Sequence, residues 1–249
     1  MFERVIGKKA QVTIFVIVAL VFGVSFGLYS LLNNTKVIEK NYPLEINALH
    51  SLIQGCINQK SESGIYYVSA RGGYYFTPEL SDDLGYPYYD YKGENKMPSK
   101  ETVEEQISAY VTEEVGLCVG NFDDLPDYNI NTSTISTETR IYDDEVVVKI
   151  NYPIIIQKDQ ETYKFEKFNE ARIPVRLGIV YNAISEFTQE QIKYDSICLS
   201  CISDICEKYD LYSKMTPIQG NTSVVFDIAD EDSKINEVTL HFIFANKYG

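Results

Sequence analysis

The distribution of apolar and polar positions divides the chain into one long uncharged segment and a larger region of mixed patterns. Residues 11–32 contain no charged side chain. At about 1.5 Å per helical residue, this segment spans the roughly 30 Å hydrocarbon layer of a bilayer. The pattern predicts a transmembrane helix over 11–32, because a helix satisfies its own backbone hydrogen bonds in lipid. Residues 33–43 are polar and end at Pro43, which predicts a linker.

Beyond the linker, two segments place apolar residues at helical spacing, and each carries a cysteine near its end. Residues 44–59 predict an amphipathic helix that contains Cys56. Residues 99–118 predict a second helix, with Ser99 as its N-cap and Cys118 as its last apolar position. The segment between them, 66–91, is rich in tyrosine, glycine and proline, which predicts short strands and turns.

The second half of the chain changes from strand patterns to a helical pattern and back. Residues 132–168 are rich in β-branched and aromatic residues and predict an antiparallel meander. Residues 172–192 predict a third helix, and 223–245 predict a hairpin that turns at 230–233. The strands and helices are segregated rather than alternating as βαβ units. The predicted fold class of 44–249 is therefore α+β, with two to three helices packed on antiparallel sheet.

The charges beside the apolar segment predict its orientation. Arg4, Lys8 and Lys9 precede it directly, and a short basic flank is normally retained on the cytoplasmic side. Residues 1–10 are therefore predicted to be cytoplasmic and residues 44–249 extracytoplasmic, in a single-pass signal-anchor protein of the cell membrane. The alternative is a secretory signal that is cleaved near residues 25–27.

The charge balance narrows the possible partners. The net charge is −14, and three of the 22 basic residues precede the apolar segment, so the predicted exterior domain is strongly acidic. An acidic surface repels nucleic acid, and none is predicted as a partner. The predicted partner is the lipid bilayer, while the charge indicates no particular surface ligand.

Small residues recur every fourth position within the apolar segment. Ala19, Gly23 and Gly27 fall on one face of the predicted helix, where small side chains allow a second helix to approach closely. This face predicts self-association through the membrane helix. The alternative is that glycine and alanine are simply common in membrane helices.

The junction before the apolar segment resembles a known processing signal. Residues 8–13 read KKAQVT, and this order of a basic pair, a small residue and a glutamine resembles the class III signal of archaeal pilins and flagellins. The resemblance implies cleavage between Ala10 and Gln11, after which the apolar helix forms a filament core. The sequence departs from many pilins at Phe15, where they carry a glutamate.

The layout of the whole chain also resembles uncharacterised archaeal single-pass surface proteins with a pilin-like start. The resemblance rests on the KKAQVTIF opening, on Cys56, on Gly-Gly-Tyr-Tyr at 72–75, on Cys118 and on FIFANKY at 242–248. It implies a cell-surface location and an order of elements, and it implies no particular activity.

The five cysteines lie on the side of the membrane that is predicted to be oxidising, which favours disulfides. Cys56 and Cys118 each lie near the end of a predicted helix, so a bridge between them would join the two helices. Cys198, Cys201 and Cys206 form a C-x2-C-x4-C cluster that leaves one thiol over after a second bridge. The alternative is a zinc or iron–sulfur site, which requires a fourth ligand in a chain with only two histidines.

Three sequons lie in polar surroundings on the predicted exterior side and are candidate glycosylation sites. Their asparagines are Asn33, Asn131 and Asn221.

Two further clusters each have a functional and a structural interpretation. Carboxylates near the predicted hairpin turn would either bind calcium or form a solvated turn; they are Asp227, Asp230, Glu231 and Asp232. Tyrosines in one short stretch would either form a recognition surface or alternate in a half-buried strand; they are Tyr86, Tyr88, Tyr89 and Tyr91.

The sequence contains no phosphate-binding loop, no nucleophile elbow and no H-E-x-x-H motif. We therefore predict no cofactor, no metal site and no enzymatic activity. The predicted function is that of a membrane-anchored cell-surface protein for adhesion, surface contact or envelope structure. One alternative is a pilin-like subunit that is processed before Gln11 and assembled into a surface filament. A second alternative is an anchored hydrolase that uses a pair of carboxylates.

Overall fold

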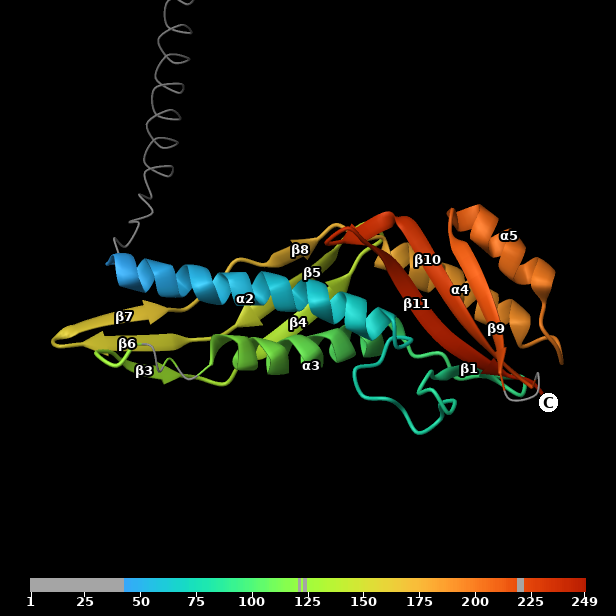
Figure 1. Ribbon diagram of the computed structural model, residues 1–249, viewed down its shortest axis with the longest axis horizontal. Helices are drawn as coiled ribbons and strands as arrows, with labels where there is room; N and C mark the ends of the chain where they lie inside the picture. Colours follow the sequence, from blue (N-terminus) through green and yellow to red (C-terminus); the bar gives the residue numbers. More distant parts are fainter. Residues whose placement is uncertain (1–42, 121, 123–124, 219–221) are drawn as a thin grey trace, which may run out of the picture. The chain divides into compact units, whose positions relative to one another are not determined.

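The computed structural model describes residues 43–120, 122, 125–218 and 222–249 (Figure 1). The chain divides into two units, Met1–Pro43 and Leu44–Gly249, and the second is an α+β domain, as predicted. The predicted cytoplasmic flank, membrane helix and nearly all of the linker lie outside the described residues. Within the part that is described, no helix is both long and apolar enough to cross a membrane.

The described part of the domain contains four helices, rather than the two to three that were predicted. They are α2 (Leu44–Ser69), α3 (Lys100–Val119), α4 (Leu177–Gln191) and α5 (Leu199–Tyr209). The additional helix is α5, which spans two of the clustered cysteines. A cysteine-rich segment of 11 residues is too short for its apolar period to stand out, and this is why the sequence pattern did not predict it.

The strands form three sheets. One has the order β3 (Asn129–Thr132), β6 (Ile154–Lys158) and β7 (Glu161–Phe165). A second has the order β4 (Ser136–Ile141), β5 (Val146–Asn151) and β8 (Ala171–Ile173). The third has the order β2 (Glu94–Asn95), β1 (Tyr88–Tyr91), β11 (Val238–Lys247), β10 (Ser223–Ile235) and β9 (Tyr212–Ile218).

The five-stranded sheet is mixed, which corrects the prediction of purely antiparallel strands. Strand β1 pairs with β11 in parallel, whereas the other pairs of this sheet are antiparallel. Parallel neighbours require a long connection, and here most of the domain lies between the two strands in the sequence. Hydrophobic patterning cannot reveal such a pairing, because it depends on where the chain returns after about 150 residues of other structure.

Helices α2 and α3 lie side by side along the domain (Figure 1). Their close approach depends on Gly64, since a Cβ atom there would lie 2.8 Å from Cδ1 of Tyr110. The Lys60 ammonium also contacts the Glu114 carboxylate at 2.8 Å. The apolar faces of both helices are buried, and α3 packs against strand β4 on its other side.

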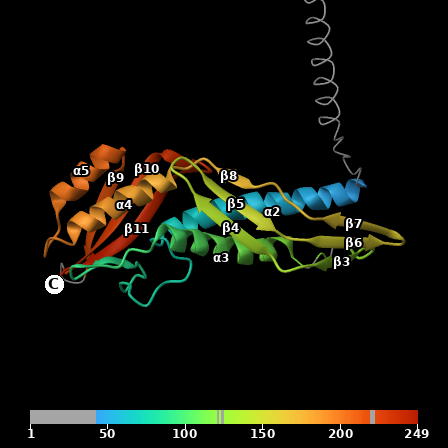
Figure 2. The same ribbon diagram turned by 180° about the vertical axis from the view of Figure 1, so that it is seen from behind.

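Helices α4 and α5 lie together against the five-stranded sheet (Figure 2). Phe187 of α4 packs on Phe226 of β10 and Phe244 of β11, with ring centroids 5.1 and 6.3 Å apart. All three rings are fully buried. Aromatic burial of this extent dominates the stability of a core, so these rings fix α4 on the sheet.

Several predicted boundaries were wrong. Helix α2 continues to Ser69, into the segment predicted as strands and turns, because its last turns pack on α3. The predicted helix 172–192 begins only at Leu177, after strand β8. The hairpin turns at Asn236 and Glu237, which have φ angles of 50° and 66° as a two-residue type I′ turn requires.

Candidate functional site

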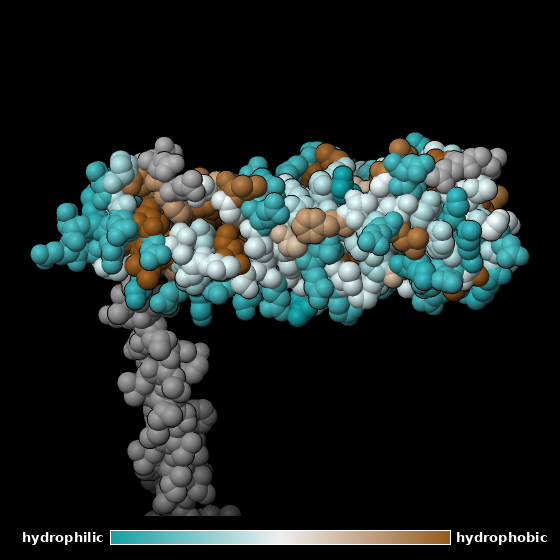
Figure 3. Space-filling model, turned by 90° about the horizontal axis from the view of Figure 1, so that it is seen from below, coloured by the Kyte–Doolittle hydropathy of each residue, from teal (hydrophilic) through white to brown (hydrophobic). Residues whose placement is uncertain are grey.

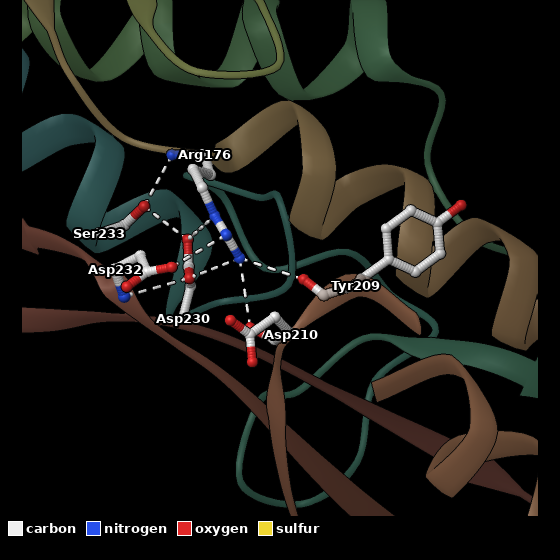
Figure 4. Close-up of polar contacts among 6 residues, drawn as sticks. All are labelled: Arg176, Tyr209, Asp210, Asp230, Asp232 and Ser233. Carbon is white, nitrogen blue, oxygen red and sulfur yellow. Dashed lines mark hydrogen bonds and ion pairs between the residues drawn. The ribbon is translucent and has the colours of Figure 1, made fainter. Parts of the chain in front are cut away.

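A polar cluster surrounds Arg176, which directly precedes α4 (Figure 4). Its Nε donates to Oδ2 of Asp230 at 3.1 Å, and its Nη2 lies 3.0 Å from Oδ1 of the same carboxylate. Nη1 donates to Asp232, and Nη2 also donates to the backbone carbonyls of Tyr209 and Asp210. The cluster therefore joins the start of α4, the end of α5 and the irregular part of β10.

The contacts of these carboxylates do not favour a calcium site in the irregular part of β10. Asp230 has no exposed surface, and its carboxylate accepts from Arg176 and from the hydroxyl of Ser233. Asp232 is bound by the same guanidinium, and Asp227 contacts His241 at 2.7 Å. The residues that the structure describes include no group of three or more carboxyl, thiol or imidazole side chains suited to a metal ion. The cluster holds elements together, since all three guanidinium nitrogens are bonded within the protein.

The two histidines lie apart and have structural environments. His50 in α2 stacks on Phe168 and meets Phe165 edge-on, with both ring centroids 5.0 Å away. His241 in β11 lies beside Asp227, across the strand pair. This places each histidine in a packing or ion-pair contact within its own part of the domain.

The predicted bridge between the first two helices is present. Cys56 of α2 and Cys118 of α3 form a disulfide that closes a separation of 62 residues. In the loop-entropy treatment, a bridge over about 60 residues stabilises the fold by roughly 4 kcal/mol. The bridge therefore reinforces the α2–α3 pair, which strands β4, β8 and β11 contact.

The cysteine cluster near α5 forms a different kind of disulfide. Cys198 and Cys201 are bridged across a separation of only three residues, and Cys206 is free and buried. In the same loop-entropy treatment, a bridge that closes about four residues stabilises the fold by roughly 2 kcal/mol, about half the stabilisation from the long bridge. Burial raises the pKa of the Cys206 thiol, and a hydrogen bond with Ser213 partly opposes this change. Cys206 is therefore a protonated core residue at neutral pH.

A groove of about 730 Å³ lies between α3 and the chain from Thr134 to Arg140. Its hydroxyl groups pair across the gap, with 2.8 Å from Ser108 to Thr139 and from Thr112 to Thr137. The carboxylate of Glu104 accepts from Arg140 and from the backbone N–H of Ile141. These contacts attach α3 to the edge strand β4.

The carboxylates of this groove bear on the hydrolase alternative. Two hydrogen bonds to the Glu101 carboxylate lower its pKa. The larger effect comes from its own backbone N–H and the smaller from the Ser99 side chain, so this carboxylate is ionised at neutral pH. Glu138 is bound to Arg140 at 2.8 Å. A glycosidase also requires a carboxylic acid whose pKa is raised, so that it is protonated when it acts. Glu101 does not have the environment for that acid role, because its pKa is lowered.

Four rings form an aromatic cluster at the end of α2, composed of Tyr67, Tyr75, Phe76 and Tyr110. Neighbouring centroids lie 4.3 to 5.9 Å apart, and Phe76 is 63% exposed. Figure 3 shows the face of the domain that carries α3 and the chain following α2, on which apolar residues are interspersed with polar ones.

Polar groups hold this aromatic cluster in place. The Tyr75 hydroxyl donates to Glu113 at 2.9 Å, and the side-chain oxygen of Gln106 accepts from the backbone N–H groups of Tyr75 and Phe76. The Arg71 guanidinium lies 4.7 Å above the Tyr67 ring. Burial raises the pKa of Tyr75 to about 12, and the contact with Glu113 adds to this rise. Polar contacts thus position the side chains of Tyr67 and Tyr75 and the backbone of Phe76.

Sequence patterns did not identify this cluster, because Tyr67 lies in a segment predicted as strands and turns, whereas Tyr110 lies in the helix predicted over 99–118. The available signal was the run Tyr74-Tyr75-Phe76 directly after a glycine pair. One of the two interpretations of the tyrosines nearby, a recognition surface, does not apply to Tyr88 and Tyr89, because both are buried in the sheet. The other interpretation was a half-buried strand with alternating side chains. The stretch does contain strand β1, but the first three residues of that strand are all buried, so its burial does not alternate.

The remaining predicted sites lie mainly outside the described residues. This applies to the processing site at Ala10 and Gln11, to the sequons at Asn33 and Asn221, and to the helix face of Ala19, Gly23 and Gly27. Asn131 is described and lies exposed on strand β3. Its side chain is therefore accessible for modification.

The fold and these sites together define an α+β domain with two disulfides and an aromatic cluster. The chain matches no protein-family model, no curated protein and no solved structure. The functional argument therefore rests on the sequence pattern and on the geometry described above.

Proposed function

We propose that this chain is a membrane-anchored cell-surface protein that makes contacts through the aromatic cluster. Residues 11–32 cross the bilayer, and residues 44–249 are presented outside the cytoplasm. The observation that carries the proposal is the Cys56–Cys118 disulfide, which joins helices α2 and α3. The domain that contains this disulfide follows an uncharged segment with a basic flank. Disulfides of this kind persist in oxidising compartments, in agreement with an exterior location.

The contact surface is assigned to the aromatic cluster because of its exposure and its polar surroundings. Phe76 presents a large apolar face, and Gln106 accepts from its backbone N–H. Glu113 and Arg71 contact the neighbouring rings of Tyr75 and Tyr67. A ring flanked by polar groups suits a ligand with alternating apolar faces and hydroxyls, such as an envelope polysaccharide. The proposed function is adhesion to such a polymer.

Protease treatment tests the location. Whole cells are incubated with a protease, and the domain is followed with an antibody against residues 44–249. We expect the domain to be lost from intact cells. Its survival on intact cells, together with its loss from lysed cells, would contradict the proposed orientation.

Substitution of the exposed ring tests the contact. Phe76→Ser in the full chain should weaken co-sedimentation with purified envelope polysaccharide at least tenfold, because an exposed aromatic anchor carries a large share of a binding energy. Leu84→Ser is the matched control, since Leu84 is 69% exposed and lies outside the aromatic cluster. Equal binding by both variants would contradict the aromatic cluster as the contact surface. It would not contradict the proposed location of the domain.

The pilin-like subunit is the second candidate, and it is supported by the sequence at residues 8–13. In that case the helix 11–32 would assemble with copies of itself after cleavage before Gln11. The two candidates differ in the state of the N-terminus, which the last prediction below addresses.

A further inference from the structure

We propose that the Cys198–Cys201 disulfide is a thiol–disulfide exchange site for a cysteine-bearing polypeptide. The two cysteines occupy the N-terminus of α5, with Cys198 as the N-cap residue and Cys201 in the first turn. This position distinguishes the pair from Cys56–Cys118, which joins two different helices across a separation of 62 residues.

The bridge is not needed to form the turn that it spans. The backbone carbonyl of Cys198 already accepts from the N–H of Ile202, and the backbone N–H of Cys198 donates to the side chain of Gln191 at 2.9 Å. These bonds define the start of α5 whether or not the sulfur atoms are joined. The disulfide can therefore open and close without unfolding the helix.

The two sulfur atoms differ in access and in environment. Cys201 is partly exposed, whereas Cys198 is 7% exposed. Cys198 Sγ accepts the backbone N–H of Cys201 at 3.3 Å, and it lies at the positive end of the helix dipole. Both features stabilise negative charge on that sulfur, and a stabilised thiolate is a good leaving group.

These differences define the direction of attack. The thiolate of a partner cysteine attacks Sγ of Cys201, the bond between Cys201 and Cys198 breaks, and Cys198 leaves as a thiolate. A second partner thiolate then attacks the partner sulfur of this mixed disulfide and releases Cys201. The partner loses two electrons and two protons and gains a disulfide, and Cys198 and Cys201 become two thiols. Reaction with a low-molecular-weight disulfide restores the pair.

A docking surface lies directly beside the pair. Leu199, between the two cysteines, is 61% exposed, and it lines a groove of about 380 Å³ together with Ile197, Thr222 and Tyr248. An exposed leucine beside a groove of this size fits an apolar side chain adjacent to the reacting cysteine of an extended polypeptide. This supports a polypeptide partner, rather than a free small thiol.

The exchange is tested with the full chain carrying Cys206→Ser, which removes the remaining free thiol. An equimolar reduced peptide with two cysteines is added, and the thiols are mapped by mass spectrometry after acid quenching and alkylation. We expect the peptide to become oxidised, with new thiols at Cys198 and Cys201 and with Cys56–Cys118 intact. A peptide that stays reduced, or opening of both bridges at equal rates, would overturn the proposal.

A monothiol probe tests the direction. After brief reaction with glutathione and acid quenching, the glutathione should be found on Cys201 and the alkyl group on Cys198, and the reverse distribution would overturn the mechanism. The double variant Cys198→Ser and Cys201→Ser should abolish exchange and lower the melting temperature by no more than about 8 °C, because the bridge closes only a short loop and serine also caps helices. A large loss of melting temperature would assign the bridge a structural role instead.

Discussion

Arg176 and Asp230 form a two-contact ion pair in which the carboxylate is fully buried. The Nε–Oδ2 and Nη2–Oδ1 distances are 3.1 and 3.0 Å, and the pair joins residues 54 positions apart. The guanidinium also donates to the backbone carbonyls at the end of α5, so the Arg176 side chain connects α4 and α5 to the five-stranded sheet. The position of α4 and α5 on that sheet therefore depends on the ion pair and the hydrogen bonds of Arg176, which lies directly before α4.

Removal of the cation should destabilise the domain strongly. Arg176→Met leaves Asp230 as a buried charge without a partner, which typically costs about 3–5 kcal/mol. Arg172→Met is the matched control, because Arg172 is 57% exposed and pairs with Glu145 and Glu170 at the surface. Exposed pairs of this kind contribute roughly 0–1 kcal/mol. The measurement is urea unfolding of the full chain in detergent, monitored by tyrosine fluorescence. An equal loss of unfolding free energy in the two variants would contradict the structural role of Arg176.

Two glycines should respond in opposite ways to substitution by alanine. A Cβ atom at Gly178 would lie 2.4 Å from the carbonyl oxygen of Tyr142, so the start of α4 would have to move away from the β4–β5 turn. Gly178→Ala should therefore cost about 2 kcal/mol or more, as overpacking does. Gly55 lies within α2 with no atom within 4 Å of the added Cβ, and Gly55→Ala should stabilise by about 0.5–1 kcal/mol. The same urea measurement compares them, and a stabilised Gly178 variant would refute the close contact.

Asp90 should make the stability depend on pH. Burial raises the pKa of Asp90, and the hydrogen bond from the backbone N–H of Gly93 opposes this only in part. A carboxyl group with a raised pKa binds its proton more tightly in the folded state. Its contribution to the free energy of unfolding therefore falls as pH rises from its unfolded pKa of about 3.9 through its folded pKa.

Asp90→Asn removes this effect and keeps an oxygen that can accept from Gly93. We expect stabilisation at pH 7, because the amide carries no charge and therefore avoids the cost of burying an ionised carboxylate, and little change at pH 3, where the carboxyl group is protonated. Melting curves of the full chain at the two pH values measure the difference. Asp159→Asn, at an exposed turn, should leave both curves unchanged. Equal stabilisation by Asp90→Asn at both pH values would exclude ionisation as the cause.

The sequence predicts those parts of this molecule that depend on local order. The apolar periods of residues 44–59 and 99–118, together with one cysteine in each, led to the correct helix pair and bridge, although Cys56 lies in the middle of α2 and not near its end. Pairings across the chain were not accessible in this way. Arg176 lies in an apolar stretch, which signals an internal partner, but only the packed fold identifies that partner as Asp230. The exposure of Phe76 likewise follows from packing and not from any spacing in the sequence.

The last prediction concerns the N-terminus and separates a fixed anchor from a filament subunit. If residues 11–32 act as a permanent anchor, the basic flank of Lys8 and Lys9 remains attached and holds the orientation of the helix. We therefore expect no cleavage between Ala10 and Gln11 when the protein is isolated from native membranes and its N-terminal peptide is measured by mass spectrometry. The variant Gln11→Leu changes the residue after the candidate cleavage bond and should leave both the mass and the membrane location as they were. A mature chain beginning at Gln11, with extracellular fibres that disappear in this variant, would instead establish the filament subunit.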